Sequence, residues 1–223
     1  MSLIANAGTM PVRHAIGYWS WSIGGLYRVG GRLGLFARAS RSGRANADRI
    51  LFGRVDPDGS VRKADAVDFV DQLEAGLKFR TDALALSLTA FRTKTQEQNF
   101  EATSRRFLQR TYRATGLEAE AALRLGAFDL NACVTWTDAR IVRDTITPAF
   151  EGNRPRRQAK LVYQITPTLD LGDVRAGLSL FGTSRAYAQD NNLLVFPAYL
   201  QTNAFVTFRV ARNTQLSVNA NNL

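Results

Sequence analysis

The segment "DQLEAGLKFRTDALALSLTAFRT", residues 71–93, decides the fold because apolar and charged residues alternate along it. The residues on one side of this alternation are apolar, and they are Leu73, Ala75, Leu77, Phe79, Leu84, Leu86, Leu88 and Ala90. Polar residues such as Gln72 and Arg80 fill the positions between them. A period of two is the pattern of a β-strand with one apolar and one polar face. The segment therefore predicts a β-hairpin that turns at 81–82.

The same alternation continues along most of the chain, and no segment keeps the 3.6-residue period of an amphipathic helix. Ten strands are expected, at about 16–28, 32–40, 67–80, 83–95, 107–124, 127–140, 156–166, 173–187, 197–210 and 214–223. Most are longer than the ~5–6 residues of an ordinary soluble strand. They reach the ~9–11 residues that a strand needs to cross a bilayer.

The connections between these strands alternate in length. The short ones are expected at 29–31, 81–82, 125–127, 166–172 and 211–213, and the long ones at 41–66, 96–106, 141–155 and 188–196. Such alternation is typical of an outer-membrane barrel, which has short turns at one end and long loops at the other. The fold class expected is all-β: an antiparallel up-and-down meander of about ten long strands, part of a larger transmembrane β-barrel. Aromatic residues near strand ends, among them Trp21, Phe91 and Trp136, suit the girdle of such a barrel.

Composition narrows the possibilities only slightly. The 223 residues are 45% hydrophobic and 22% charged, which is ordinary for a folded domain. The net charge of +10 suits an anionic ligand, nucleic acid or an anionic membrane surface. The start of the chain lacks the pattern of a signal peptide. Residues 1–15 are expected to be a disordered start or a cloning remnant, and 16–223 a partial barrel domain.

Four stretches together resemble a known family: "VDQLEAGLKFRTDALALSLTAFRTKTQEQNF" (70–100), "YRATGLEAEAALRLGAFDLNACVTWTDARI" (112–141), "EGNRPRRQAKLVYQI" (151–165) and "LSVNANNL" (216–223). They are similar, in this order, to the C-terminal part of the barrel of TonB-dependent outer-membrane receptors. The resemblance implies a bacterial outer-membrane protein with a barrel of ~22 strands. The chain is then expected to be a fragment that lacks the plug and the final strand.

An enzymatic function is not expected. His14 is the only histidine, so a nucleophile–histidine centre would depend on it. Glu118 and Glu120 lie on one strand face, ~6.7 Å apart along the backbone, where paired carboxylates could serve acid–base chemistry. We favour the alternative that they are lumen charges, paired with basic groups on neighbouring strands. The lumen-facing residues expected are Glu74, Lys78, Glu118, Glu120 and Arg124. With one cysteine and one histidine, no metal site and no cofactor are expected.

Basic residues gather at the predicted long loops. The candidate ligand-binding residues of these extracellular loops are Arg44, Arg49, Arg105, Arg106, Arg110, Arg154 and Arg156. Guanidinium groups bind carboxylate and phosphate well, so these residues suit capture of an anionic solute. The alternative, which we slightly favour, is contact with phosphorylated outer-leaflet lipid or simple solvation. Nucleic acid is not an expected partner, because the clusters lack aromatic residues for base stacking.

Two functions follow. The resemblance implies part of an energy-coupled receptor for a scarce nutrient, such as siderophore-bound iron, cobalamin or an oligosaccharide. Its partners would be outer-membrane lipid and a small-molecule ligand, with TonB contacted only through the plug region. The alternative is a soluble all-β binding protein whose basic face takes a polyanion. Dependence on detergent separates the two.

Overall fold

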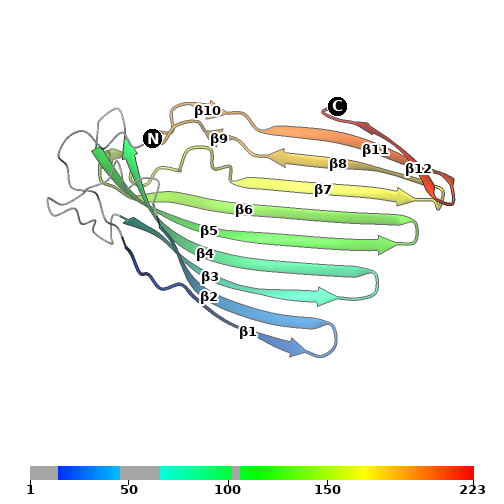
Figure 1. The fold of residues 1–223 in the computed structure, drawn as a ribbon, viewed down its shortest axis with the longest axis horizontal. Coiled ribbons are helices and arrows are strands. Elements are labelled where there is room, and N and C mark those ends of the chain that lie inside the picture. The colour runs from blue at the N-terminus through cyan, green and yellow to red at the C-terminus, as the bar shows by residue number, and fades with distance from the viewer. Residues whose placement is uncertain (1–14, 46–65, 102–105) are drawn as a thin grey trace.

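The computed structural model describes residues 15–45, 66–101 and 106–223, with the side chains of 99–101 and 106–107 outside the description. It contains a ten-stranded antiparallel sheet in which the strands follow one another in the order β1-β2-β3-β4-β5-β6-β7-β8-β11-β12 (Figure 1). The strands are β1 (Trp21–Val29), β2 (Leu33–Ala45), β3 (Val67–Arg80), β4 (Leu84–Glu101), β5 (Arg106–Leu125), β6 (Phe128–Asp144), β7 (Leu161–Asp170), β8 (Val174–Thr183), β11 (Tyr199–Ala211) and β12 (Thr214–Ala220). Among the described residues, no helix is long and apolar enough to cross a membrane.

The predicted meander of ten long strands is confirmed, but several boundaries differ. β1 begins at Trp21 rather than 16, β2 and β6 extend to Ala45 and Asp144, and β7 begins at Leu161 rather than 156. The turn expected at 166–172 is shorter, because β7 passes through Pro167 and keeps its register with β6 on both sides. The loop expected at 96–106 is mostly strand, since β4 ends at Glu101 and β5 begins at Arg106. In the β8–β11 connection, β9 (Ala186–Tyr187) pairs with β10 (Val195–Phe196), a small hairpin that the alternation did not predict.

The register places the alternating leucine, alanine and valine residues of these strands on one face of the sheet. Leu77 of β3 lies between Leu35 of β2 and Leu88 of β4, and the row continues through Ala119 to Val134. The next row along the strands faces the other way and contains Lys78, Ser87, Glu120, Cys133 and Gln164. We call these the apolar face and the polar face. A one-residue slip between any two strands would mix them.

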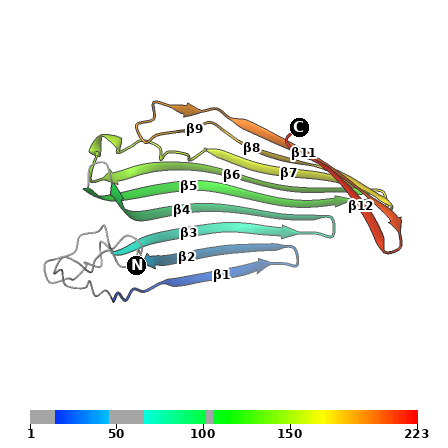
Figure 2. The ribbon, with the colours of Figure 1, turned by 45° about the horizontal axis from the view of Figure 1, so that its top comes forward.

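The sheet is curved rather than flat, and β12 comes forward when the molecule is turned (Figure 2). A hollow of about 500 Å³ lies near the tight-turn end, and Lys78, Arg80, Ser87, Glu120 and Cys133 are among its lining residues. These residues belong to the polar face, so this face is hollowed where the sheet bends. The apolar face is accordingly exposed, as Leu73 and Leu117 show with more than half of their surface accessible.

Aromatic rings on adjacent strands cover several glycines. The pairs are Phe36 on Gly76, Phe91 on Gly116, Tyr163 on Gly182 and Phe205 on Gly177. Phe91, which the sequence suggested for an interfacial girdle, therefore lies on the polar face opposite Gly116. Because glycine has no side chain, the ring of the neighbouring strand fits over it. The ring in turn covers backbone that the glycine leaves without a side chain to pack.

We predict that Leu86→Arg impairs assembly of the receptor containing this chain, whereas Ser87→Arg is tolerated. Leu86 lies between Phe79 and Ala121 on the apolar face, and Ser87 lies between Lys78 and Glu120 on the polar face. An arginine on a lipid-facing position costs about 2–4 kcal/mol at the bilayer midplane. Heat-modifiable electrophoretic migration measures the assembled fraction, and equal effects of the two substitutions would reject this assignment of the faces.

Gly116→Val should destabilise the barrel by about 1–3 kcal/mol, the usual cost of overpacking. A Cβ at Gly116 would collide with the ring of Phe91 and with the carbonyl oxygen of Trp136. Gly25→Val in β1 is the matched control, because no atom lies within 4 Å of the Cβ position there. Denaturant unfolding of the two variants tests the difference, and a neutral Gly116→Val would show that the ring does not depend on this glycine.

Candidate functional site at the loop end of the sheet

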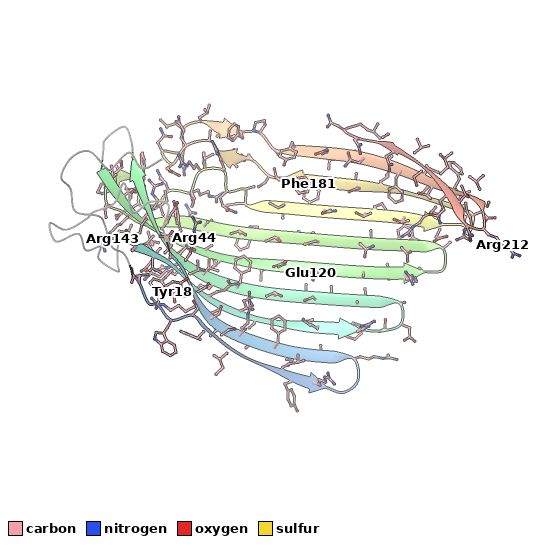
Figure 3. The ribbon with its side chains drawn as sticks, viewed as in Figure 1. Tyr18, Arg44, Glu120, Arg143, Phe181 and Arg212 are labelled. Atoms are coloured by element: carbon pink, nitrogen blue, oxygen red, sulfur yellow. The ribbon has the colours of Figure 1, made fainter. Side chains whose placement is uncertain are left out.

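Two long connections meet at the end of the sheet opposite the tight turns. They are residues 145–160, between β6 and β7, and residues 184–198, between β8 and β11. Arg44, Arg143 and Tyr18 lie at this end, and Arg212 lies at the other (Figure 3). The first connection contains a short 3-10 helix, Pro148–Phe150. It then runs back along β6, where Ile141 bonds to Asn153 and Gly152 through backbone groups.

Arg110 of β5 joins both connections to the sheet. Its Nε donates to Asp144 Oδ2 at 2.9 Å, and its Nη2 binds the same oxygen. Its Nη1 donates to Asp190 Oδ2 at 2.7 Å. The side chains of all three residues are at most 9% exposed. Asp190 is 80 positions from Arg110 in the chain, so this one guanidinium holds the β8–β11 connection against strand β5.

A β-bulge in β6 decides which residue faces Arg110. Tyr112 pairs with Ile141 while Thr111 pairs with Arg143, so Val142 has no opposite residue on β5. If β6 paired here without the bulge, Val142 would lie opposite Thr111 and Arg143 opposite Arg110. The bulge puts Asp144 there instead. A shift of one residue thus replaces a repulsive pair with an ion pair.

The carboxylates of the clamp also organise the loop backbone. Asp144 Oδ1 accepts hydrogen bonds from the backbone N–H groups of Ile146 (3.0 Å) and Thr147 (2.9 Å). Asp190 Oδ1 accepts one from the backbone N–H of Arg156 at 2.8 Å. Every oxygen of the two buried carboxylates therefore has a donor, as burial of a charge requires.

The surroundings keep Asp144 ionised. Burial opposes its charge, but the Thr147 N–H, Arg110 and the Ile146 N–H outweigh it and hold the pKa of Asp144 below its ordinary value of 3.8. The guanidinium is also held charged: burial acts against it, yet hydrogen bonds to Tyr112 and Asp144 raise the pKa of Arg110. Because the pKa of Asp144 is depressed, its contribution to stability is present above pH 3.8 and is lost only as pH falls through the folded-state pKa.

The arginines singled out from the sequence occupy different settings. Arg110 is taken up by the clamp, and Arg154 donates to Asp138 Oδ1 at 3.3 Å. The side chain of Arg156 is 60% exposed and lies 3.9 Å from Asp190. Arg44 is exposed and opposite Asp68 in the register. Arg49 and Arg105 lie outside the described residues, as does the side chain of Arg106.

The five residues expected to face the lumen all lie on the polar face. These residues are Glu74, Lys78, Glu118, Glu120 and Arg124, and their pairings with neighbouring strands place them there. Glu74 binds Arg38 at 2.8 Å, and Arg124 binds Asp129 at 2.7 Å.

Glu118, Glu120 and Cys133 lie together on the polar face, with their potential ligand atoms within 4.8 Å of one another. The sequence did not suggest this grouping, although the distance between Cys133 and the glutamates follows from the register of β5 and β6. Three mixed donors on an open face fall short of the four-ligand sphere of structural zinc.

A model of the family described as "TonB dependent receptor-like, beta-barrel" matches residues 6–223. The chain belongs to this family. A search of curated proteins gave no match. The fold resembles those of the siderophore receptor PiuA from Acinetobacter baumannii (17% identity, TM-score 0.74), the ferric yersiniabactin uptake receptor FyuA from Yersinia pestis (16%, 0.71) and the ferric-catecholate import receptor Fiu from E. coli K12 (18%, 0.72).

These comparisons cover 91%, 92% and 92% of this chain but only 31%, 31% and 30% of the solved chains. The TonB-receptor chain described here thus spans about a third of each solved receptor. The likeness establishes a segment of a receptor barrel, as the resemblance of the four stretches implied.

Arg110→Met should loosen both connections, because removing one partner of a buried ion pair costs about 3–5 kcal/mol. Asp144 would then be buried without its cation, so its pKa should rise. A carboxyl with a raised folded-state pKa loses stability as pH increases through that pKa. We therefore expect hydrogen exchange at Thr147 and Gly152, corrected for intrinsic rates, to accelerate in the variant and more at pH 8 than at pH 5.

Arg124→Met is the control for this experiment. Its ion pair with Asp129 is exposed and lies at the tight-turn end, so it should leave exchange at Thr147 and Gly152 unchanged. The wild-type protein should show the same corrected exchange between pH 5 and pH 8. Protection in Arg110→Met equal to that of the wild type would show that the clamp does not hold the loops.

Proposed function

We propose that this chain is part of a bacterial outer-membrane receptor for energy-coupled uptake of a scarce nutrient. Candidate ligands are an iron–siderophore complex, cobalamin or an oligosaccharide. The chain is assigned no enzymatic role, no cofactor and no nucleic-acid partner. Its own partners are outer-membrane lipid and the small-molecule ligand, while contact with TonB belongs to the plug region of such receptors.

The observation that carries this proposal is the unbroken apolar face. Ten neighbouring strands keep their apolar residues in register, and the face remains exposed. In water such a surface would be far larger than a monomeric soluble protein tolerates. The soluble polyanion-binding alternative is therefore disfavoured. Membership of a receptor-barrel family supports the same conclusion.

The loop end is the proposed place of ligand contact. Of the arginines suggested by the sequence, Arg156 and Arg44 have exposed side chains there, whereas Arg110 and Arg154 are held by carboxylates. We therefore assign ligand contact to the exposed pair and a positioning role to the other two. The clamp supports this division because Asp190 also holds the backbone of Arg156.

A growth assay tests the proposed function. A strain that lacks the gene encoding this receptor should grow more slowly when iron is supplied only as a ferric siderophore, and the intact gene should restore growth. The same comparison with cobalamin and with an oligosaccharide as the limiting nutrient identifies the ligand class. A protein that stays soluble without detergent after cell fractionation would contradict the outer-membrane assignment.

If the ligand is anionic, replacing Arg44 and Arg156 by glutamine should slow its association and flatten the dependence of this rate on salt. Exposed charges act mainly through long-range attraction, which salt screens over about 8–10 Å. The control replaces Arg28 and Arg212, which are exposed at the tight-turn end, and removes the same charge. Stopped-flow binding at two ionic strengths measures the effect. Equal association rates for both double variants would reject an anionic ligand at this site.

A further inference from the structure

The apolar face changes character toward the loop end of the sheet. Beyond its last apolar row, the register aligns Arg41, Asp71, Lys94, Arg113 and Arg140 across strands β2 to β6. These residues alternate with polar-face positions just as Leu73 and Leu117 do, so they point to the same side as the apolar residues. We call this set the basic row.

Three cations of the basic row are direct neighbours. Lys94 lies opposite Arg113, and Arg113 lies opposite Arg140. Side chains at opposed positions have Cβ atoms about 4.5–5.5 Å apart, and like charges there are destabilising. All three are exposed. Arg140 shares Asp138 with Arg154, each at 3.3 Å. Lys94 lies opposite Asp71, which already pairs with Arg41 at 3.5 Å, and Arg113 makes no ion pair among the described residues. The arrangement calls for an anion from outside.

A hollow of about 580 Å³ adjoins the basic row at the loop end. Its lining includes Trp19, Trp21, Arg41, Phe69 and Arg143. Trp21 lies opposite Arg41 in the register, and the Arg41 guanidinium stacks on the Phe69 ring at 4.4 Å. The volume is in the range of small-molecule sites, and the walls combine flat aromatic surface with cationic groups.

Gln98 adds a polar group that lacks its partner. It also lines this hollow, its side chain is buried, and its Oε1 accepts no hydrogen bond from any described residue. A buried acceptor without a donor costs about 1–3 kcal/mol, so a hydroxyl-bearing ligand would be favoured there. The hollow therefore offers aromatic rings for a flat apolar surface and an acceptor for a hydroxyl group, and the basic row, which meets it at Arg41, offers cations for phosphate.

The position of the basic row along the strands indicates the source of the ligand. Lys94 is four residues beyond Ala90 of the last apolar row, or about 13 Å along the strand. The exposed Leu117 and Trp136 lie in the same row as Ala90. In a barrel whose apolar face contacts hydrocarbon, the basic row lies at the level of the lipid headgroups.

We propose that the basic row and the adjoining hollow bind the phosphorylated sugar headgroup of an outer-leaflet glycolipid. Lys94, Arg113 and Arg140 hold the phosphates, while the sugar lies against the tryptophans and donates a hydroxyl to Gln98. This inference rests on the proposed outer-membrane location. It concerns the outer surface of the barrel and is independent of the nutrient that the receptor takes up.

The test uses the receptor containing this chain, purified in detergent and titrated with bisphosphorylated lipid A, with the same lipid lacking both phosphates, and with inorganic pyrophosphate. The variant carries Lys94→Gln, Arg113→Gln and Arg140→Gln. The matched control carries Arg28→Gln, Arg80→Gln and Arg175→Gln, which remove the same charge from the polar face near the tight turns. Native mass spectrometry gives the bound lipid, and thermal unfolding reports any stabilisation.

We expect bisphosphorylated lipid A to bind the variant about ten- to a hundredfold more weakly than the wild type, as the loss of charge-assisted hydrogen bonds implies. The control should bind like the wild type, and the dephosphorylated lipid should bind weakly to all. Lipid A should raise the melting temperature of the wild type and of the control, but not that of the variant.

Equal binding of lipid A by wild type and variant would overturn the inference. Binding of pyrophosphate as tight as that of lipid A would also overturn it, because the site would then take a free anion rather than a lipid. Cell fractionation separates failure of the proposed function from failure of the glycolipid site. A receptor that is absent from the outer membrane contradicts the proposed function. A receptor that is present there but indifferent to lipid A contradicts only the glycolipid site.

Discussion

The antiparallel register between neighbouring strands is the constraint on which the rest of the structure depends. It aligns Leu77 with Leu88 and Ala119, and it aligns Lys78 with Ser87 and Glu120 on the other side. Because side chains alternate with a period of two, each pairing fixes the facing of a whole strand. A slip of one residue in a single pairing would turn the charged side chains of that whole strand onto the apolar face, where burial in hydrocarbon disfavours them.

A departure from this rule between β5 and β6 is also where the loops are organised. The extra residue at Val142 shifts β6 and brings Asp144 opposite Arg110. The resulting clamp reaches Asp190 in the β8–β11 connection and, through it, the backbone of Arg156. A bulge at the rim of the sheet thus sets the position of loops far apart in the chain. Bulges commonly serve this purpose at barrel rims.

Sequence patterns predicted the strands and their faces because the alternation of apolar and polar residues can be seen within each strand. Pairing then only aligns the faces of neighbouring strands. They failed where the outcome depends on pairing. Pro167 falls in the turn expected at 166–172, yet β7 continues through it and stays in register with β6. Arg110 was grouped with loop arginines for ligand contact, and only the bulge and the distant Asp190 show that its donors are occupied.

The basic row escaped sequence reasoning for a related reason. Lys94, Arg113 and Arg140 are far apart in the chain and lie within strands, so counting arginines in loops does not find them. They meet only because the register of β4, β5 and β6 places them opposite one another.

Strands β4 and β5 continue beyond the last apolar row, so both faces of the sheet extend past it toward the loop end. On the polar face it supports Arg110 and the loop clamp, and on the opposite face it supports the three adjacent cations. The clamp has its counter-charges built in, whereas Arg113 makes no ion pair among the described residues and Lys94 faces only Asp71, which Arg41 also binds. The same ladder therefore produces a self-contained ion pair toward the interior. Toward the lipid it produces a row with more cations than acidic partners, and this difference leads us to expect an anion from the membrane.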